Sequence, residues 1–349
     1  MRNKTSSMLI GAAVAALLVL PAAAGDPGWV TWPTKSFPTT ALRVEDIIGN
    51  VRVNVQNGPM KVDVSGPKNL ISGVSVRADG NVLRISGNET DSYNVWDWRS
   101  WFDFSHIHDD HSGKLYIKVT VPKGGDVRVE DMIGDTTVGD TYGVIRLETT
   151  AGNATVGRVR EAHVMMAGSG KTSIADVAGD LRLEIAGSGH VTASHAGSVR
   201  AEIYGSGDAQ VGSITGGVHI EIAGSGDFTA ARVNGPVSID IAGSGNVKIA
   251  DGVADPLRVD IAGAGDLYFG GVAVNPSISA LGSGNVHIKA YRGKLSNDGM
   301  ASVMIGDRIP PVPPMPPVPG IPPVPPVPGH AAQPPAPPAH HSDDDDDDN

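Results

Sequence analysis

Residues 218–227 read VHIEIAGSGD, and close copies of this stretch recur along the chain. Apolar and polar residues alternate up to the glycine, as in a strand that buries one face. Gly-Ser-Gly then predicts a tight turn, because glycine adopts positive φ at little steric cost. Gly-Ser-Gly begins at Gly168, Gly187, Gly205, Gly224, Gly243 and Gly282, and Gly-Ala-Gly begins at Gly263. The spacings of 18 to 20 residues predict that each copy forms one coil of a stacked solenoid.

A second short strand follows each turn, as in residues 247–249, and helical spacing is absent. Short strands joined by glycine turns in coils of about 19 residues are typical of a parallel β-helix. Residues 37–87 and 115–121 contain similar strands between Gly, Asn and Pro turns, so we expect the first coils of the same solenoid there. The sequence therefore predicts an all-β protein with one β-helix domain at 37–306, preceded by a lead-in at 25–36.

The chain has 349 residues and a formal net charge of −11, from 27 Lys and Arg against 38 Asp and Glu. This balance argues against a nucleic-acid binder, because phosphate contacts require clustered Lys and Arg. The chain has no cysteine. Disulfides, thiolate metal sites, a cysteine nucleophile and a lipoprotein anchor are therefore not expected.

Residues 1–24 predict a cleavable signal peptide. Arg2 and Lys4 precede an apolar run of 13 residues, and the small-residue site Ala22-Ala23-Ala24 follows. The run is too short for a membrane-spanning helix, and no later stretch is long enough. We therefore expect an exported protein with no transmembrane segment in the mature chain, located in the periplasm or on the outer surface of a bacterial envelope.

Residues 88–113 concentrate aromatic and histidine residues in a chain that is otherwise poor in aromatics. The candidate contact residues are Trp96, Trp98, Trp101, Phe102 and Phe104. The candidate metal ligands are His106, His108, His111, Asp109 and Asp110. Three interpretations remain open: a cap on the solenoid, an exposed loop whose aromatic faces contact a glycan, lipid or protein, or a site for a divalent cation such as zinc. No other cofactor is indicated.

Residues 307–342 form a Pro-rich tail, with 16 of the 26 prolines after Arg308. Apolar residues recur at every third position, namely Ile309, Val312, Met315, Val318, Ile321, Val324 and Val327. Polyproline II has three residues per turn, so these side chains form one stripe on a stiff rod. The tail is either a rigid spacer or a ligand for a protein partner, which would dock through Val312, Met315, Val318, Ile321 and Val324.

Residues 343–349 contain six consecutive Asp. A block of like charges repels itself, which predicts a disordered and solvated end. Contact with cationic surfaces or weak capture of divalent ions is the alternative.

Acidic residues recur three positions before the first glycine of five consecutive coils: Glu184, Glu202, Glu221, Asp240 and Asp260. Two positions earlier stand Arg182, Arg200, His219, Ser238 and Arg258. This pattern indicates either a solvated face of Arg–acid pairs or a stripe for a cation or a cationic partner near Glu221 and Asp240, where Arg is missing.

A further set of Asp and Asn follows the turns: Asp208, Asp227, Asn246, Asp266 and Asn285. Asp and Asn at such positions typically serve turn geometry, and the nonapeptide calcium repeat is not present.

The repeated A-G-S-G-(D/N) units resemble the auto-transporter adhesin head domain, also called the GIN domain, of bacterial envelope proteins. The opening strands at 42–44 and 51–55 resemble it as well, so the likeness covers about residues 37–290. The resemblance implies a right-handed β-helix in an exported protein, and it implies no catalytic residues. A true autotransporter also needs a C-terminal barrel of at least ~8 strands, whereas a Pro-rich tail follows Gly306 here.

The sequence favours a non-enzymatic envelope protein that adheres to, or interacts with, a surface glycan, lipid or protein. The alternative is a periplasmic scaffold whose protein partner docks on the Pro-rich tail. A polysaccharide-active or metal-binding enzyme is disfavoured, because the coils are too short to build groove walls and no G-x-S-x-G, H-E-x-x-H or phosphate-cradling loop occurs.

Overall fold

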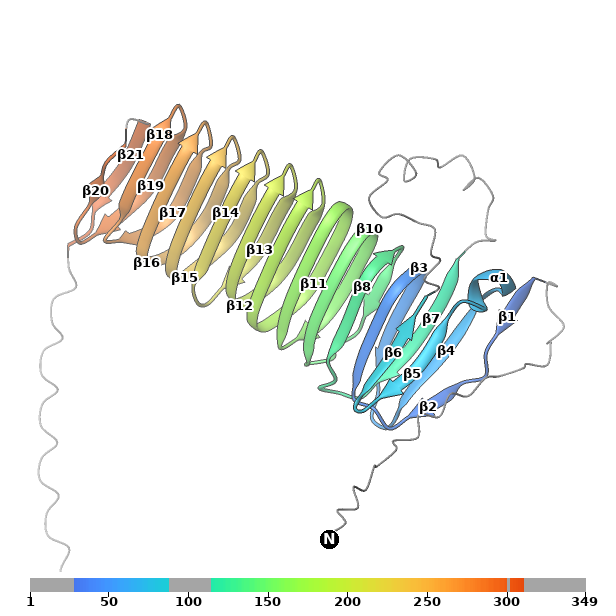
Figure 1. The fold of residues 1–349 in the computed structure, drawn as a ribbon. Helices are drawn as coiled ribbons and strands as arrows, with labels where there is room; N and C mark the ends of the chain where they lie inside the picture. The colour runs from blue at the N-terminus through green and yellow to red at the C-terminus, as the bar shows by residue number, and fades with distance from the viewer. Residues whose placement is uncertain (1–27, 88–113, 300–301, 311–349) are drawn as a thin grey trace, which may run out of the picture. The chain divides into compact units, whose positions relative to one another are not determined.

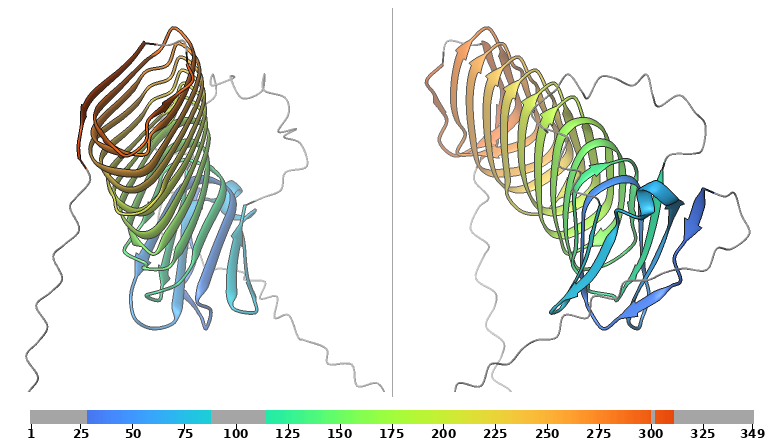
Figure 2. Two further views of the ribbon diagram at one scale, coloured as in Figure 1. Left: turned by 90° about the vertical axis from the view of Figure 1, so that its left-hand side faces the viewer. Right: turned by 45° about the vertical axis from the view of Figure 1, so that its right-hand side comes forward.

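Figure 1 shows the computed structural model, which describes residues 28–87, 114–299 and 302–310. Within these residues the chain forms one continuous sheet of 21 strands that winds into a solenoid. The first strands lie at one end of the solenoid and the last strands at the other (Figures 1 and 2). The predicted all-β class and the stacked parallel coils are confirmed.

The strands fall into an N-terminal group and a regular series of coils. The first group comprises β1 (Trp29–Thr31), β2 (Lys35–Phe37), β3 (Ala41–Val55), β4 (Met60–Pro67), β5 (Ser75–Asp79), β6 (Val82–Ser86) and β7 (Leu115–Val121). The coils continue with β8 (Val127–Ile133), β9 (Thr136–Val138), β10 (Val144–Val159), β11 (Glu161–Gly187), β12 (His190–Gly205), β13 (Asp208–Ile214) and β14 (Val218–Gly224). The remaining strands are β15 (Phe228–Gly243), β16 (Val247–Gly263), β17 (Leu267–Val274), β18 (Ser277–Gly282), β19 (Asn285–Arg292), β20 (Ser296–Asn297) and β21 (Ser302–Arg308).

Successive coils stack in parallel with equivalent residues side by side. Val218 of β14 pairs with Val199 of β12 on one side and with Val237 of β15 on the other. Val237 pairs in turn with Leu257 of β16. The sequence period therefore equals one turn of the solenoid, as the Gly-Ser-Gly spacing predicts.

The core is the interior of the coils, and it is filled by the alternate residues of each strand. In β14 the inward residues Val218, Ile220 and Ile222 are all buried. On the second wall Phe228 lies beside Ala209, and this pairing of a large residue with a small one lets the coils stack without a void. Burying each such aliphatic side chain contributes roughly 1.5–3 kcal/mol, so the stability is spread evenly along the stack.

The N-terminal residues differ from the prediction of regular first coils. β3 does join the parallel stack, where it pairs with β6, β7, β8 and β9. β4, in contrast, pairs antiparallel with β7, and β5 pairs antiparallel with β6. The prediction is thus correct for β3 and wrong for β4 and β5. The reason at β5 is the two-residue connection Gly80-Asn81, which forms a hairpin rather than a coil corner.

The predicted lead-in contains two strands. β1 and β2 both pair antiparallel with β4, and they lie at the N-terminal end of the solenoid (Figure 1). A single-turn helix, α1 (Lys68–Ile71), follows β4 and buries Ile71. β4 covers an edge of the stacked strand β7, and β1 and β2 pair with β4 in turn, which is a common way of blocking further strand addition.

The two glycines of each turn have different roles. The first one has positive φ at Gly187, Gly205, Gly224, Gly243, Gly263 and Gly282, as predicted, whereas in the copy at 168–170 the positive φ falls on the second glycine, Gly170. At Gly224 a Cβ atom would also lie 2.3 Å from the carbonyl oxygen of Gly205 in the preceding coil. The second glycine is required by close approach instead, because a Cβ on Gly226 would lie 2.7 Å from the Ile203 methyl group.

We expect Gly224→Ala to lower the free energy of unfolding by about 2–4 kcal/mol, because it adds both backbone strain and a clash with the preceding coil. The measurement is urea denaturation followed by circular dichroism. Gly139→Ala is the matched control, since a Cβ there would meet no atom closer than 3.6 Å, and it should leave stability nearly unchanged. Equal effects of the two substitutions would contradict this assignment of the turn glycines.

Candidate functional site

The predicted aromatic, metal and tail residues lie outside the described residues. They are Trp96, Trp98, Trp101, Phe102, Phe104, His106, His108, Asp109, Asp110, His111, Val312, Met315, Val318, Ile321 and Val324. Their roles stay predictions. Across residues 28–87, 114–299 and 302–310, no group of three His, Asp or Glu is placed to hold a metal ion, and no helix is long and apolar enough to cross a membrane.

The described part of the chain presents two charged columns on one outer wall of the solenoid. Strand pairing places Arg182, Arg200, His219, Ser238 and Arg258 in a row, which we call the basic column. The same pairing aligns Glu184, Glu202, Glu221, Asp240 and Asp260, which we call the acidic column. Both columns point away from the core, because the residues between them are buried. The predicted charged face therefore exists.

The same columns continue into the N-terminal coils, where their charges are paired. Arg43 contacts Glu45 at 2.8 Å and Glu130 at 2.9 Å. Arg84 contacts Glu45 at 3.2 Å, and Arg128 contacts Glu130. The sequence analysis missed this continuation, although β3 and β8 show the same alternation of Arg and Glu between apolar residues.

The later coils differ, because most of their charges have no such partner. Arg200 contacts Glu202 at 2.6 Å, but within the described residues neither Arg182 nor Arg258 forms an ion pair. Arg182 and Arg258 are also exposed. The columns thus change from internally paired to available for a ligand along the solenoid axis.

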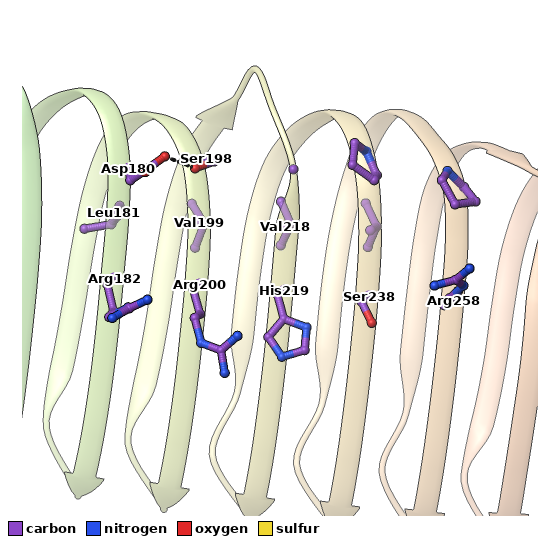
Figure 3. Close-up of a pocket in the computed structure, with 14 residues that line it drawn as sticks. Asp180, Leu181, Arg182, Ser198, Val199, Arg200, Val218, His219, Ser238 and Arg258 are labelled. Carbon is purple, nitrogen blue, oxygen red and sulfur yellow. Dashed lines mark hydrogen bonds between the residues drawn. The ribbon is translucent and has the colours of Figure 1, made fainter.

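A shallow open groove of about 430 Å³ follows the basic column over five coils. Figure 3 shows Arg182, Arg200, His219, Ser238 and Arg258 in a line along it. The opposite rim is the corner of the coils, where Ser198 donates a hydrogen bond to Asp180 and where Pro236 and Pro256 lie. The corner residues do not repeat in type, so the sequence pattern contained no signal for the groove.

Two groups in the continuation of the columns have pKa values shifted towards the neutral form. Burial lowers the pKa of His163, and the positive charges of Arg182 and Arg146 lower it further, so this imidazole is neutral at pH 7. Burial raises the pKa of Glu148, and the negative charges of Asp131 and Glu130 add to this effect. Stacked like charges therefore add to the effect of burial on the pKa of Glu148.

The Asp and Asn residues after the turns form a ladder of hydrogen bonds between coils. Asp227 Oδ1 accepts from the backbone N–H of Asn246 at 2.9 Å, and Asn246 Oδ1 accepts from the N–H of Asp266 at 3.2 Å. Asp208 and Asp266 accept equivalent bonds from the next coil. These bonds join neighbouring coils rather than closing a turn, so the role of these residues in turn geometry stays a prediction. The ladder also includes Asn50, Asp135 and Asn153, which the sequence analysis did not assign to it.

This architecture defines the protein as a β-solenoid with an open, charged lateral wall. The chain belongs to the family described as "Putative auto-transporter adhesin, head GIN domain", whose model matches residues 46–235. The family resemblance seen in the sequence is thereby confirmed. Among curated proteins, none matches the chain.

Several solved structures are similar to this chain. A putative adhesin from Parabacteroides distasonis is 15% identical, with 81% of this chain and 98% of that chain covered and a TM-score of 0.36. A putative lipid binding protein from the same species is 15% identical, with coverages of 82% and 98% and a TM-score of 0.36. A putative adhesin from Parabacteroides merdae is 13% identical, with coverages of 82% and 98% and a TM-score of 0.35.

We expect Asp227→Ala to lower the free energy of unfolding by about 1 kcal/mol, because the N–H of Asn246 loses its acceptor. Asp227→Asn should retain stability, since Asn keeps the acceptor oxygen and already occupies the equivalent position at 246 and 285. Urea denaturation of the two variants checks this. A loss as large in the Asn variant would show that the carboxylate charge, rather than the hydrogen bond, matters.

We expect Glu148→Gln to stabilise the protein at pH 7.5 by on the order of 0.5 kcal/mol, the scale of like-charge repulsion on a sheet face. The sign follows from the raised pKa: the folded state binds the proton more tightly than the unfolded chain, so the ionised carboxylate costs stability above that pKa. The advantage of Gln should disappear as the pH falls through the folded pKa. Thermal melts between pH 4 and 8 measure it.

The matched control is Asp79→Asn, which removes one negative charge from the exposed hairpin strand β5. It should show no comparable gain at any pH. A gain of equal size would mean that net charge alone, rather than the position of Glu148 in the column, sets the effect.

Proposed function

We propose that the chain is an exported, non-enzymatic protein of a bacterial envelope that adheres to a surface component through the lateral wall of its solenoid. The observation on which this rests is the open groove along the basic column, which spans five coils. An extended, shallow surface suits a polymer or another surface, whereas small-molecule substrates usually occupy enclosed pockets. Membership of the adhesin-head family supports the same role.

The geometry of the carboxylates also favours a binding role over catalysis. Glycoside hydrolysis uses one pair of carboxylates at a set separation across the scissile bond, usually in a groove with defined walls. Here the acids of the acidic column repeat in every coil from Glu184 to Asp260, and Gly-Ser-Gly turns keep the coils short. We therefore infer that repetition, rather than one unique constellation, is the functional feature of this wall.

Two further proposals concern residues outside the described ranges. The aromatic residues of 88–113 would add a second contact, and the tail after Arg308 would act as spacer or docking ligand. In the docking alternative the protein is a periplasmic scaffold, and its partner binds the apolar stripe that includes Val312, Val318 and Val324.

Co-sedimentation with isolated envelope fractions tests these proposals. Chains 26–349 and 26–308 are compared on peptidoglycan and on outer-membrane vesicles, at two salt concentrations. We expect equal binding by both chains, because the solenoid wall is present in both. We also expect about tenfold weaker binding of Arg182→Gln/Arg258→Gln, since each Arg offers a charge-assisted fork of donors.

The other outcomes discriminate between the proposals. Binding that requires the tail and is lost on replacing Val312, Val318 and Val324 with Ser would support the docking alternative. If chains 26–349 and 26–308 bind equally and the arginine double variant also retains binding, the contact would be assigned to residues 88–113. Failure of both chains to bind any fraction would contradict the adhesion proposal.

A further inference from the structure

We infer that the wall formed by the basic and acidic columns binds a zwitterionic glycan, a sugar polymer with anionic groups and free amino groups along the same chain. This inference rests on the proposed adhesion function and names the chemical class of its ligand. It follows from four features of the wall: unpaired arginines, unpaired carboxylates, an exposed aromatic ring and the length of the groove.

The unpaired arginines account for the anionic groups of the ligand. Arg182 and Arg258 are exposed, line the groove and form no ion pair within the described residues. A guanidinium presents a planar fork of donors that matches a carboxylate or phosphate. Arg43 and Arg128, at equivalent positions of the N-terminal coils, are paired with Glu45 and Glu130, whereas Arg146, Arg182 and Arg258 form no ion pair within the described residues.

The unpaired carboxylates account for the amino groups. In the two central coils the basic column holds His219 and Ser238, so Glu221 and Asp240 lack an arginine beside them. They face each other across adjacent strands, half-buried, where like charges repel. A ligand ammonium placed between them would relieve that repulsion. A purely anionic polymer would instead be repelled by the acidic column. A purely cationic polymer would be repelled by the arginines of the basic column.

The aromatic ring favours a sugar as the backbone of the ligand. Tyr204 follows Glu202 on the same wall, is 39% exposed, and is flanked in the neighbouring coils by the small residues Ala186 and Ala223. Its hydroxyl donates to Glu202 at 3.3 Å, which orients the ring without covering it. A flat ring beside alanines leaves a platform on which the apolar face of a sugar can stack.

The dimensions favour a polymer over a single residue. Arg182 and Arg258 are four coils apart, which corresponds to about 19 Å at the usual strand spacing. The basic and acidic positions of one strand are two residues apart, or about 6.8 Å. The wall therefore carries two parallel rows of opposite charge, and an extended chain lying along the solenoid axis contacts several members of each row at once.

The test uses three probes of equal length: hyaluronan oligosaccharide, which carries only carboxylates; chitosan oligosaccharide, which carries only amines; and N-deacetylated hyaluronan, which carries both. Binding to the full mature chain is measured by isothermal titration calorimetry at two salt concentrations. We expect N-deacetylated hyaluronan to bind at least about tenfold more tightly than either other probe. Equal affinities for the three probes would overturn the inference.

Separate variants test the role of the arginines and the role of the carboxylates in binding. Arg182→Gln/Arg258→Gln should weaken binding of the zwitterionic probe by roughly tenfold. The same double variant should bind chitosan as tightly as the unmodified chain does, or more tightly. Glu221→Gln/Asp240→Asn should shift the preference towards hyaluronan. Arg77→Gln, on the exposed hairpin strand β5, is the matched control and should change nothing. Loss of binding in the control as great as in the double variant would contradict a specific wall site.

The failure of this inference can be separated from failure of the adhesion proposal. Envelope co-sedimentation that persists while all three glycans fail to bind would overturn the ligand class and leave adhesion standing. Binding of phosphatidylcholine vesicles through the same arginines and carboxylates, with no glycan binding, would replace the glycan with a lipid surface. Circular dichroism of every variant establishes that the fold is retained.

Discussion

The structure depends on one backbone contact that recurs in successive coils from Ser188 to Ser283. The N–H of the residue after the first turn glycine donates to the carbonyl oxygen of the equivalent glycine in the preceding coil, as from Ser225 to Gly205 at 2.8 Å and from Ser244 to Gly224 at 2.8 Å. A side chain at the glycine would occupy the space of that oxygen. The contact therefore requires glycine, brings the coils into register and sets the position of every other residue in the stack.

Register converts a repeated sequence into continuous columns. Inward positions become stacks of Val, Ile and Leu, turn positions become a ladder of Asp and Asn, and outward positions become rows of like charge. Rows of like charge are unfavourable unless they are neutralised, and the N-terminal coils neutralise theirs internally through Arg43 and Glu130. In the later coils Arg200 pairs with Glu202, but Arg182 and Arg258 form no ion pair within the described residues, and we interpret that difference as the mark of a binding surface.

The sequence predicts the solenoid correctly because its register is local and periodic: the turn phrase and the alternation of 218–224 recur with little variation. It does not predict the antiparallel pairing of β4 and β5, since that pairing depends on which edge remains free once β3 and β7 have stacked. The two columns can be recognised in the sequence as a repeating pattern, whereas the groove cannot. Its rim is built by unlike residues such as Ser198 and Pro236, which meet only through the register.

Disulfide mapping can measure the register of the outer wall in a chain that has no cysteine of its own. Glu221→Cys/Asp240→Cys places two thiols on paired positions of adjacent coils, where the Cα separation falls within disulfide range. Glu221→Cys/Asp260→Cys places them two coils apart. The account predicts complete oxidation of the first pair and none of the second within one chain. Efficient closure of the second pair, or failure of the first, would contradict it.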